Sequence, residues 1–164
     1  MRNGFTLIEL MVVIAIVAIL LGMGIASYNN WKKKYDIEND TKRIFSALTE
    51  ARIKTFSEKR VYGITWSENP FKRFELRYDT DNDGDITDNP GSEKISEITL
   101  KGSSFIGSIG GFKKYVKFSK EGIAKNLGNI RASNLDIIPE YNCINISRTR
   151  IKMGQWNGSD CEVR

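Results

Sequence analysis

Apolar residues follow three different patterns along this chain. From Phe5 to Ala26 nearly every position is apolar, and Glu9 is the one charged residue of the segment. Over residues 27–56 the apolar residues recur at the spacing of an amphipathic helix. Residues 57–164 contain short segments that alternate or are rich in β-branched and aromatic residues, which predicts strands. These patterns predict an α+β chain that begins with a long helix.

The apolar segment is long enough to cross a membrane. As a helix, residues 5–26 would extend about 33 Å, against a hydrocarbon core of about 30 Å. Glu9 conflicts with this environment, because a carboxylate in a span costs roughly 2.5–3.5 kcal/mol at the bilayer centre. An ionisable group in such a segment indicates a function, and we expect Glu9 to have a partner.

Three hypotheses explain the segment. A cleaved secretory signal would end before Ser27, but residues 5–26 exceed the usual apolar length of about 7–15 residues. A plain signal anchor accounts for the length and leaves Glu9 unexplained. For such an anchor the lysines at 32–34 would, by charge alone, favour a cytoplasmic position for the rest of the chain. The third hypothesis is a resemblance.

The segment "GFTLIELMVVIAIVAIL" resembles the N-terminus of type IV pilins and of the pseudopilins of type II secretion. The resemblance implies that residues 1–4 are a leader, which a prepilin peptidase removes at Gly4–Phe5, and that Phe5 is then N-methylated. It implies that Glu9 is an assembly residue, which pairs with the Phe5 amine of a neighbouring subunit. Cleavage would also place that amine four residues before Glu9, on the same helix face.

The resemblance also implies partners and a location. The partners are other pilins or pseudopilins in a filament, the prepilin peptidase and the inner-membrane assembly platform. The protein would be a single-pass protein of the bacterial inner membrane, with its C-terminal domain outside the cytoplasm. It would then enter a pilus or pseudopilus, in the periplasm or at the cell surface.

Residues 27–56 are expected to extend the same helix beyond the membrane. Trp31 and the lysines at 32–34 suit a membrane interface. The first proline is Pro70, so an uninterrupted helix is expected. One helix face is predicted to pack on a sheet, and it contains Ile37, Thr41, Ile44, Phe45, Leu48 and Ala51.

Residues 57–164 are predicted to form a β-rich globular domain. The expected strands lie in "RVYGITW", "RFELRY", "KISEITL", "KYVKFS", "NLDII" and "CINISRTRIKM". Clusters of Gly, Asn and Pro separate them. A long transmembrane and amphipathic helix packed on an antiparallel sheet is a pilin-like α+β fold.

The order of these segments is similar to that of the GspH/FimT family of minor pseudopilins. The similar parts are "RIFSALTEARIKTFSEKRVYGITW", the aspartate-rich "FELRYDTDNDGDITDNPGSEKI", "VKFSKEGIAKN" and the closing "CINISRTRIKM". The resemblance implies a structural protein and not an enzyme. It would enter or prime a type IV pilus or a type II secretion pseudopilus.

Composition agrees with a non-catalytic role. The chain carries a net charge of +5 and no histidine, so Ser-His-Asp and Cys-His sites are excluded. The charge is uneven, at −4 over residues 36–100 and +6 over residues 101–164. The basic excess suits either solubility or an acidic polymer.

The segment "DTDNDGDITD" has the spacing of the first half of an EF-hand loop. The glutamate that closes such a loop is missing, because position twelve is Pro90. The segment is therefore either a structural calcium site or a solvated turn, and no other cofactor is expected. The candidate ligands are Asp79, Asp81, Asp83, Asp85 and Asp88.

Strand alternation in "INISRTRIKM" places Arg148, Arg150 and Lys152 on one side, after a bend or sheet edge near Ser147. Cations at this spacing suit a phosphate backbone. The segment resembles the GRxR element that contributes to DNA binding in the FimT branch, which gives an alternative function as a filament-associated receptor for double-stranded DNA in DNA uptake. Lys113, Lys114 and Lys117 are the expected outer contacts. The other interpretation is an edge strand guarded by charge.

Cys143 and Cys161 have no CxxC spacing, so neither a zinc site nor a redox motif is indicated. Outside the cytoplasm, two such cysteines are expected to form a disulfide. The topology that the pilin resemblance implies places them there.

Overall fold

The structure is a computed structural model that describes residues 4–88, 90–111, 113–134, 136 and 138–163. The predicted leader is described only at Gly4, because residues 1–3 lie outside this part. The chain begins with helix α1 (Leu7–Glu58). The strands that follow are β1 (Tyr62–Thr65), β2 (Arg73–Asp79), β3 (Ser92–Thr99), β4 (Phe105–Ile109), β5 (Tyr115–Phe118), β6 (Gly128–Ala132), β7 (Cys143–Ile146), β8 (Ile151–Trp156) and β9 (Cys161–Val163).

Helix α1 is continuous over 52 residues, as the sequence predicts. It runs through two compact units, residues 1–33 and 34–164. In the first unit the large apolar side chains of residues 5–21 are exposed, and the helix has an 18-residue window with a mean hydropathy of 2.8. Length and composition therefore suit a membrane span. The helix begins at Leu7, two residues later than the predicted span, because Thr6 caps it.

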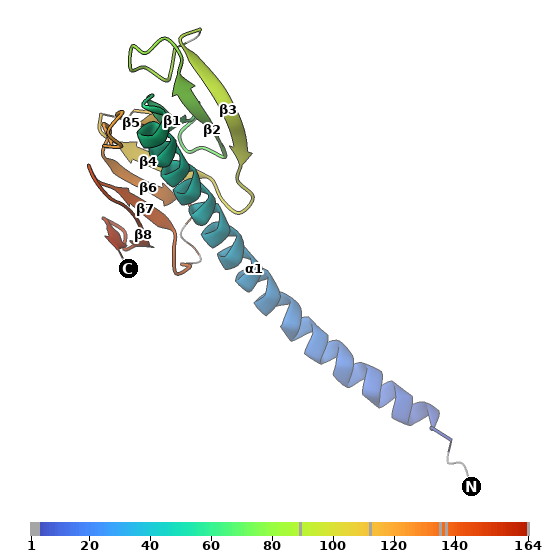
Figure 1. The fold of residues 1–164 in the computed structure, drawn as a ribbon. Coiled ribbons are helices and arrows are strands. Elements are labelled where there is room, and N and C mark those ends of the chain that lie inside the picture. The colour runs from blue at the N-terminus through green and yellow to red at the C-terminus, as the bar shows by residue number, and fades with distance from the viewer. Residues whose placement is uncertain (1–3, 89, 112, 135, 137, 164) are drawn as a thin grey trace. The chain divides into compact units, whose positions relative to one another are not determined.

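The second unit contains two antiparallel sheets where one was predicted. Their strand orders are β3-β2-β1-β5 and β4-β6-β7-β8-β9. The backbones of Phe71 and Phe105 connect them, with each N–H donating to the other's carbonyl at 2.7 and 2.8 Å. The α+β, pilin-like fold class is confirmed, with residues 34–58 of α1 against both sheets (Figure 1).

The core of the second unit forms between one face of α1 and the inner faces of the sheets. The predicted face is confirmed, since Ile44, Leu48 and Ala51 are fully buried and Phe45 is partly buried against the core. The sheets supply the largest buried side chains, among them Phe71, Phe74, Phe105, Phe118, Ile64, Leu76, Ile109, Ile130 and Ile144.

Two strand predictions are wrong. The strand expected in "NLDII" lies earlier, as β6, and the exposed Asn134, Asp136 and Ile138 are outside it, while residues 135 and 137 are not described. The segment "CINISRTRIKM" is a hairpin rather than one strand. The N–H and the hydroxyl of Ser147 both donate to the carbonyl of Arg150 at 2.9 Å, and this turn separates β7 from β8.

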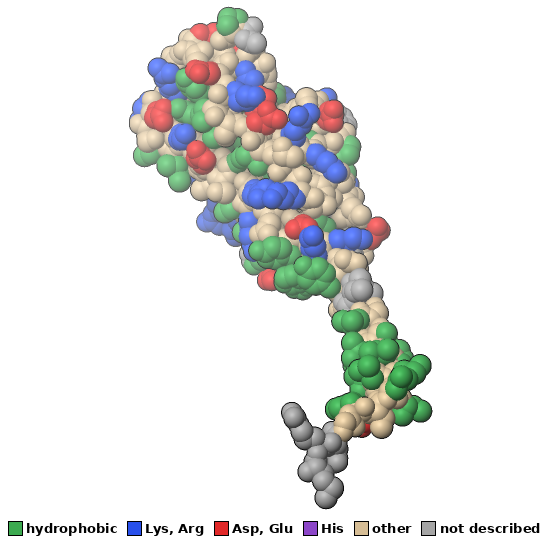
Figure 2. Space-filling model, turned by 90° about the vertical axis from the view of Figure 1, so that its right-hand side faces the viewer, with side chains coloured by type: hydrophobic (Ala, Val, Ile, Leu, Met, Phe, Trp, Pro, Cys, Tyr) green, Lys and Arg blue, Asp and Glu red, His purple; other side chains and the backbone are tan. Residues whose placement is uncertain are grey.

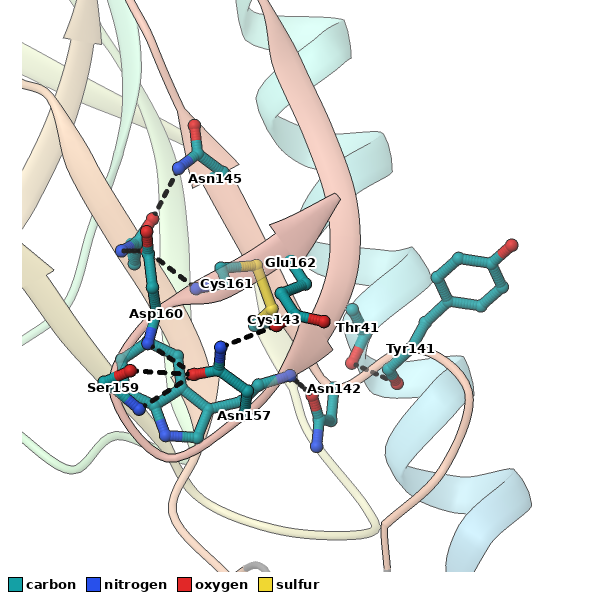
Figure 3. The surroundings of a disulfide bond; sticks show 12 residues. Thr41, Tyr141, Asn142, Cys143, Asn145, Asn157, Ser159, Asp160, Cys161 and Glu162 are labelled. Carbon is teal, nitrogen blue, oxygen red and sulfur yellow. Dashed lines mark hydrogen bonds between the residues drawn. A yellow bond between two sulfur atoms is a disulfide. The ribbon is translucent and has the colours of Figure 1, made fainter. Parts of the chain in front are cut away.

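Cys143 of β7 and Cys161 of β9 form a disulfide, with their Cα atoms 5.9 Å apart (Figure 3). The bond closes the loop that contains β8. Cross-linking a loop of 18 residues stabilises a fold by about 3 kcal/mol in the chain-entropy model. The short edge strand β9 is therefore held on the sheet by a covalent bond as well as by its backbone pairing with β8.

A buried carboxylate attaches α1 to the loop between β3 and β4. Oδ2 of Asp40 accepts hydrogen bonds from the N–H groups of Lys101 at 2.8 Å and Gly102 at 2.6 Å. Gly102 lies directly on the helix, where a Cβ would come within 2.7 Å of the carbonyl carbon of Asp36. Desolvation raises the pKa of Asp40 above its ordinary value, although these donors act in the opposite direction.

We expect Asp40→Ala to lower the free energy of unfolding by about 1–3 kcal/mol, because buried donors lose their acceptor. Asp40→Asn keeps an acceptor and removes the buried charge, so it should retain stability at neutral pH. Since the folded state raises the pKa of Asp40, its contribution to stability is fully present below the unfolded pKa of about 3.9 and is lost as the pH rises through the folded pKa.

Thermal unfolding between pH 3.5 and 7.5 checks both expectations. Asp36→Asn is the matched control, because it removes the same charge one turn earlier on the helix. Equal losses of stability in Asp40→Ala and Asp40→Asn would contradict the role of the carboxylate as an acceptor.

Candidate functional site

The N-terminus of α1 carries a reciprocal cap made by Thr6 and Glu9. The N–H of Glu9 donates to Oγ1 of Thr6 at 3.4 Å, and the N–H of Thr6 donates to Oε2 of Glu9 at 3.5 Å. This is the geometry of a capping box, which satisfies donors that the first helical turn leaves free. Within one chain, the partner of Glu9 is therefore Thr6.

The sequence contains the signal for this cap, which our interpretation of Glu9 did not use. Threonine followed three residues later by glutamate, directly before an apolar run, is the capping-box pattern. Gly4 and Phe5 precede the helix, and Phe5 is 80% exposed. The Gly4–Phe5 bond thus lies outside the helix and close to the capped turn.

The part of α1 that follows the cap presents apolar side chains all round. Figure 2 shows hydrophobic side chains around this N-terminal part of the helix. The exposed residues include Leu7, Ile8, Leu10, Met11, Val12, Val13, Ile14, Ile16, Val17, Ile19, Leu20 and Leu21. In water such a surface would drive association, so a lipid or protein environment suits it.

The aspartate loop between β2 and β3 is folded around Asp79. This residue is 2% exposed, and its two carboxylate oxygens accept the N–H groups of Asn82 at 2.6 Å and Gly84 at 2.7 Å. Asn82 and Gly84 both have positive φ, at 72° and 87°, as a tight turn of this kind requires. The sharp turn expected at Gly84 is present.

Three of the five predicted metal ligands lie together. Asp79, Asp81 and Asp83 each offer one oxygen, and these oxygens lie within 4.8 Å of one another. Asp85 instead accepts the N–H and the hydroxyl of Thr87, both at 2.8 Å, and these two bonds lower its pKa. Desolvation raises the pKa of Asp88, and the neighbouring aspartates contribute by repulsion. A half-loop that can hold a cation is therefore formed by the first three aspartates.

Two side chains fix this loop to the neighbouring strands. Ile86 is fully buried and occupies the space above Gly63 of β1, where a Cβ would collide with it. Lys117 of β5 donates a hydrogen bond from Nζ to the carbonyl of Gly84. The loop is thus packed on the outer face of the first sheet.

The candidate DNA-binding residues occupy the β7–β8 turn and the strand after it. Arg148 and Arg150 are exposed in the turn, and Lys152 is exposed on β8 opposite Asn145. Within the described part of the chain none of the three has an ion-pair partner. The bend predicted near Ser147 is confirmed as this turn. The predicted strand alternation of Arg148, Arg150 and Lys152 is wrong, because the turn itself presents the two arginines.

The three lysines predicted as outer DNA contacts already interact with other groups of the domain, whereas the arginine side chains of the turn have no ion pair among the described residues. Nζ of Lys114 donates to the carbonyl of Ser67 at 2.7 Å, and Lys117 is bonded to the aspartate loop. Lys113 lies over the ring of Tyr115 at 5.6 Å. The structure instead brings Lys125 close to the turn, because the carbonyl of Arg148 accepts the N–H of Ala124 at 3.0 Å. Sequence spacing gave no signal for this contact.

Comparison with known proteins agrees with the N-terminal geometry. Residues 1–25 match the family model described as the prokaryotic N-terminal methylation motif. The chain is also similar to Type II secretion system protein H of Pseudomonas aeruginosa, with 29% identity over 77 residues. That match covers 47% of this chain and 44% of protein H, which is less than half of the relative's length. No solved structure matches the chain.

The motif, the capped apolar helix and the pilin-like α+β fold together support a type IV pilin-like protein. The partial similarity to protein H supports, more narrowly, a minor pseudopilin, which confirms the resemblance that the sequence indicates.

Proposed function

We propose that the protein is a structural subunit of a type IV pilus or a type II secretion pseudopilus. It is made with the leader at residues 1–4, cleaved at Gly4–Phe5 by a prepilin peptidase and N-methylated on Phe5. The observation that carries the proposal is that Gly4 and Phe5 are exposed directly before a capped helix, whose first part is apolar apart from a carboxylate in its first turn. Its role is structural rather than catalytic.

Glu9 has two tasks in this proposal. In the monomer it caps its own helix through Thr6. In the filament the new amine of a neighbouring Phe5 meets the carboxylate, and charge pairing offsets the cost of holding both groups in an apolar environment. Before assembly the subunit is anchored in the inner membrane by α1, with residues 34–164 outside the cytoplasm. Its partners are then other pilin-like subunits and the assembly platform.

We expect protein from native membranes to begin at Phe5 with one added methyl group, and intact-mass analysis checks this.

We expect Glu9→Gln to be cleaved and inserted normally and to be depleted from filaments. Glutamine can also serve at position N3 of a capping box, three residues after the N-cap threonine. This variant therefore removes the charge and keeps the cap.

Thr6→Val is the matched control, because it weakens the cap and keeps the charge of Glu9. Filament fractions from the variant strains, compared by quantitative immunoblot, separate the two tasks. Normal stoichiometry of Glu9→Gln in filaments would contradict charge pairing, and a mature N-terminus at Ser27 would contradict the whole proposal.

A second candidate function is that of a filament-associated receptor for double-stranded DNA. The observation that favours it is the exposed turn with Arg148 and Arg150, which have no ion-pair partner among the described residues. Together with Lys152 they can neutralise phosphates. Such contacts carry no base readout, so binding would be independent of sequence.

For the full-length protein in a neutral detergent, we expect the log of DNA affinity to fall against the log of salt concentration with a slope near −3, at roughly 0.9 per neutralised phosphate. Replacing Arg148 and Arg150 by glutamine should reduce the steepness by about 2. Lys42→Gln with Lys72→Gln removes the same charge elsewhere and is the control. Equal binding by both double variants would show that the arginines do not bind DNA. Their role would then be to protect a sheet edge from pairing with other chains.

The aspartate loop supports a separate proposal, a structural calcium ion held by Asp79, Asp81 and Asp83. Carboxylate oxygens are the ligands that calcium prefers, and two further ligands in an EF-hand loop are a backbone carbonyl and water. The ion would relieve repulsion among the aspartates and stiffen the loop between β2 and β3.

Calcium should raise the melting temperature of the protein, because a ligand that binds only the folded state increases the free energy of unfolding. At a calcium concentration of a hundred times its Kd, the increase is about 2.7 kcal/mol. Asp81→Asn with Asp83→Asn should abolish this shift. Magnesium at the same concentration is the ionic control, since it binds all-protein cages poorly. The same melting temperature in chelator and in millimolar calcium would show an ordinary turn.

A further inference from the structure

Loop 119–125, between β5 and β6, lies beside the turn 147–150 between β7 and β8, which we call the arginine turn. Two backbone hydrogen bonds hold the C-terminal end of this loop against its neighbours. The N–H of Ala124 donates to the carbonyl of Arg148 at 3.0 Å, and the N–H of Lys125 donates to the carbonyl of Lys117 at 2.9 Å. The end of the loop therefore lies between β5, which directly precedes the loop, and the distant turn 147–150, and each of these segments contributes a cation.

This loop gathers further charge around a single acid. Gly122 packs against the side chain of Arg52, with 3.6 Å between the Cβ position of Gly122 and Cγ of Arg52. The pKa of Glu121 lies below its ordinary value, first because of the Ser119 hydroxyl and then because of the charges of Lys125 and Lys59. Glu121 and Lys125 also line the same groove, so both side chains border one space.

This groove, which the loop borders, has a volume of about 480 Å³. Lysines 117, 120 and 125 line it together with two carboxylates, those of Glu121 and of Asp83 in the aspartate loop. Lys125 and Glu121 are both exposed, and Lys125 has no ion-pair partner among the described residues. On the side of the groove away from Asp83, a phosphate beside Lys125 would meet the opposing carboxylate of Glu121, while Lys117 is bonded to the carbonyl of Gly84.

We propose that loop 119–125 and turn 147–150 form one phosphate-binding surface, in which Lys125 is a direct contact and Glu121 competes with phosphate for that lysine. The proposal rests on the DNA-binding candidate function and goes beyond it, because it adds a second loop and a built-in competitor. Glu121 weakens non-specific binding, so the affinity of the surface is set below what its cations alone would give.

A double-mutant cycle on the full-length protein in neutral detergent tests the proposal. The probe is a fluorescently labelled DNA duplex, and its anisotropy is followed over a salt series. Lys125→Gln should make the salt slope shallower by about 0.9, the value of one lost phosphate contact. Glu121→Gln should increase affinity roughly fivefold and make the slope steeper by up to about 0.9. In the Lys125→Gln background, Glu121→Gln should have almost no effect, because the two residues act as a pair.

Lys72→Gln and Glu140→Gln are the matched controls, since each makes the same charge change at another place in the domain. If the wild type binds and Lys125→Gln behaves like Lys72→Gln, the shared surface is wrong and the arginine turn remains a DNA-binding candidate. If Glu121→Gln has the same effect in the Lys125→Gln background as in the wild type, Glu121 acts only through long-range repulsion of the DNA. The proposed competition for Lys125 would then be wrong. Absence of wild-type binding at low salt would remove both proposals.

Discussion

The contact between one face of α1 and the two sheets is the interaction on which the rest of the second unit depends. Ile44, Leu48 and Ala51 are fully buried there, and the aromatic side chains of both sheets surround them. The sheets are joined to each other directly through the backbones of Phe71 and Phe105, and both pack their inner faces on the same face of the helix. Polar groups of the same helix then fix loops, as Asp40 does for residues 101 and 102.

Periodicity made the helix and most strands predictable, because burial follows it directly. The helical face from Ile37 to Ala51 could be read from spacing alone. The division into two sheets could not, because strand pairing depends on contacts between distant segments. Strand β9 has only three residues, too few for a pattern, and Gly107 and Ser108 interrupt the apolar residues of β4. A bend near Ser147 could be expected from the sequence, but not the hydrogen-bonded turn that makes the segment a hairpin.

The candidate sites show the same limit at the level of single side chains. Residue types located the capped N-terminus, the aspartate loop and the arginine turn. Sequence did not show that Asp85 turns away to Thr87, that Lys117 is committed to Gly84, or that Lys125 lies beside the turn. Each of these facts results from the way that loops fold back on the sheets. The charge of a residue is visible in the sequence, while its available partners are set by the tertiary fold.

The seat of Ile86 above Gly63 has a consequence for how this loop can vary between proteins. Because the strand offers a hole and the loop fills it, the two positions form one module, although they are far apart in the sequence. A Cβ at position 63 would collide with the carbonyl oxygen of Val116 on β5 and come within 2.5 Å of Cδ1 of Ile86, so a larger residue would disturb both the strand pairing and the isoleucine that holds the loop. Transplanting the loop to another pilin-like host therefore requires a glycine at the corresponding point of the adjacent strand, and substitutions at the two sites should be inherited together.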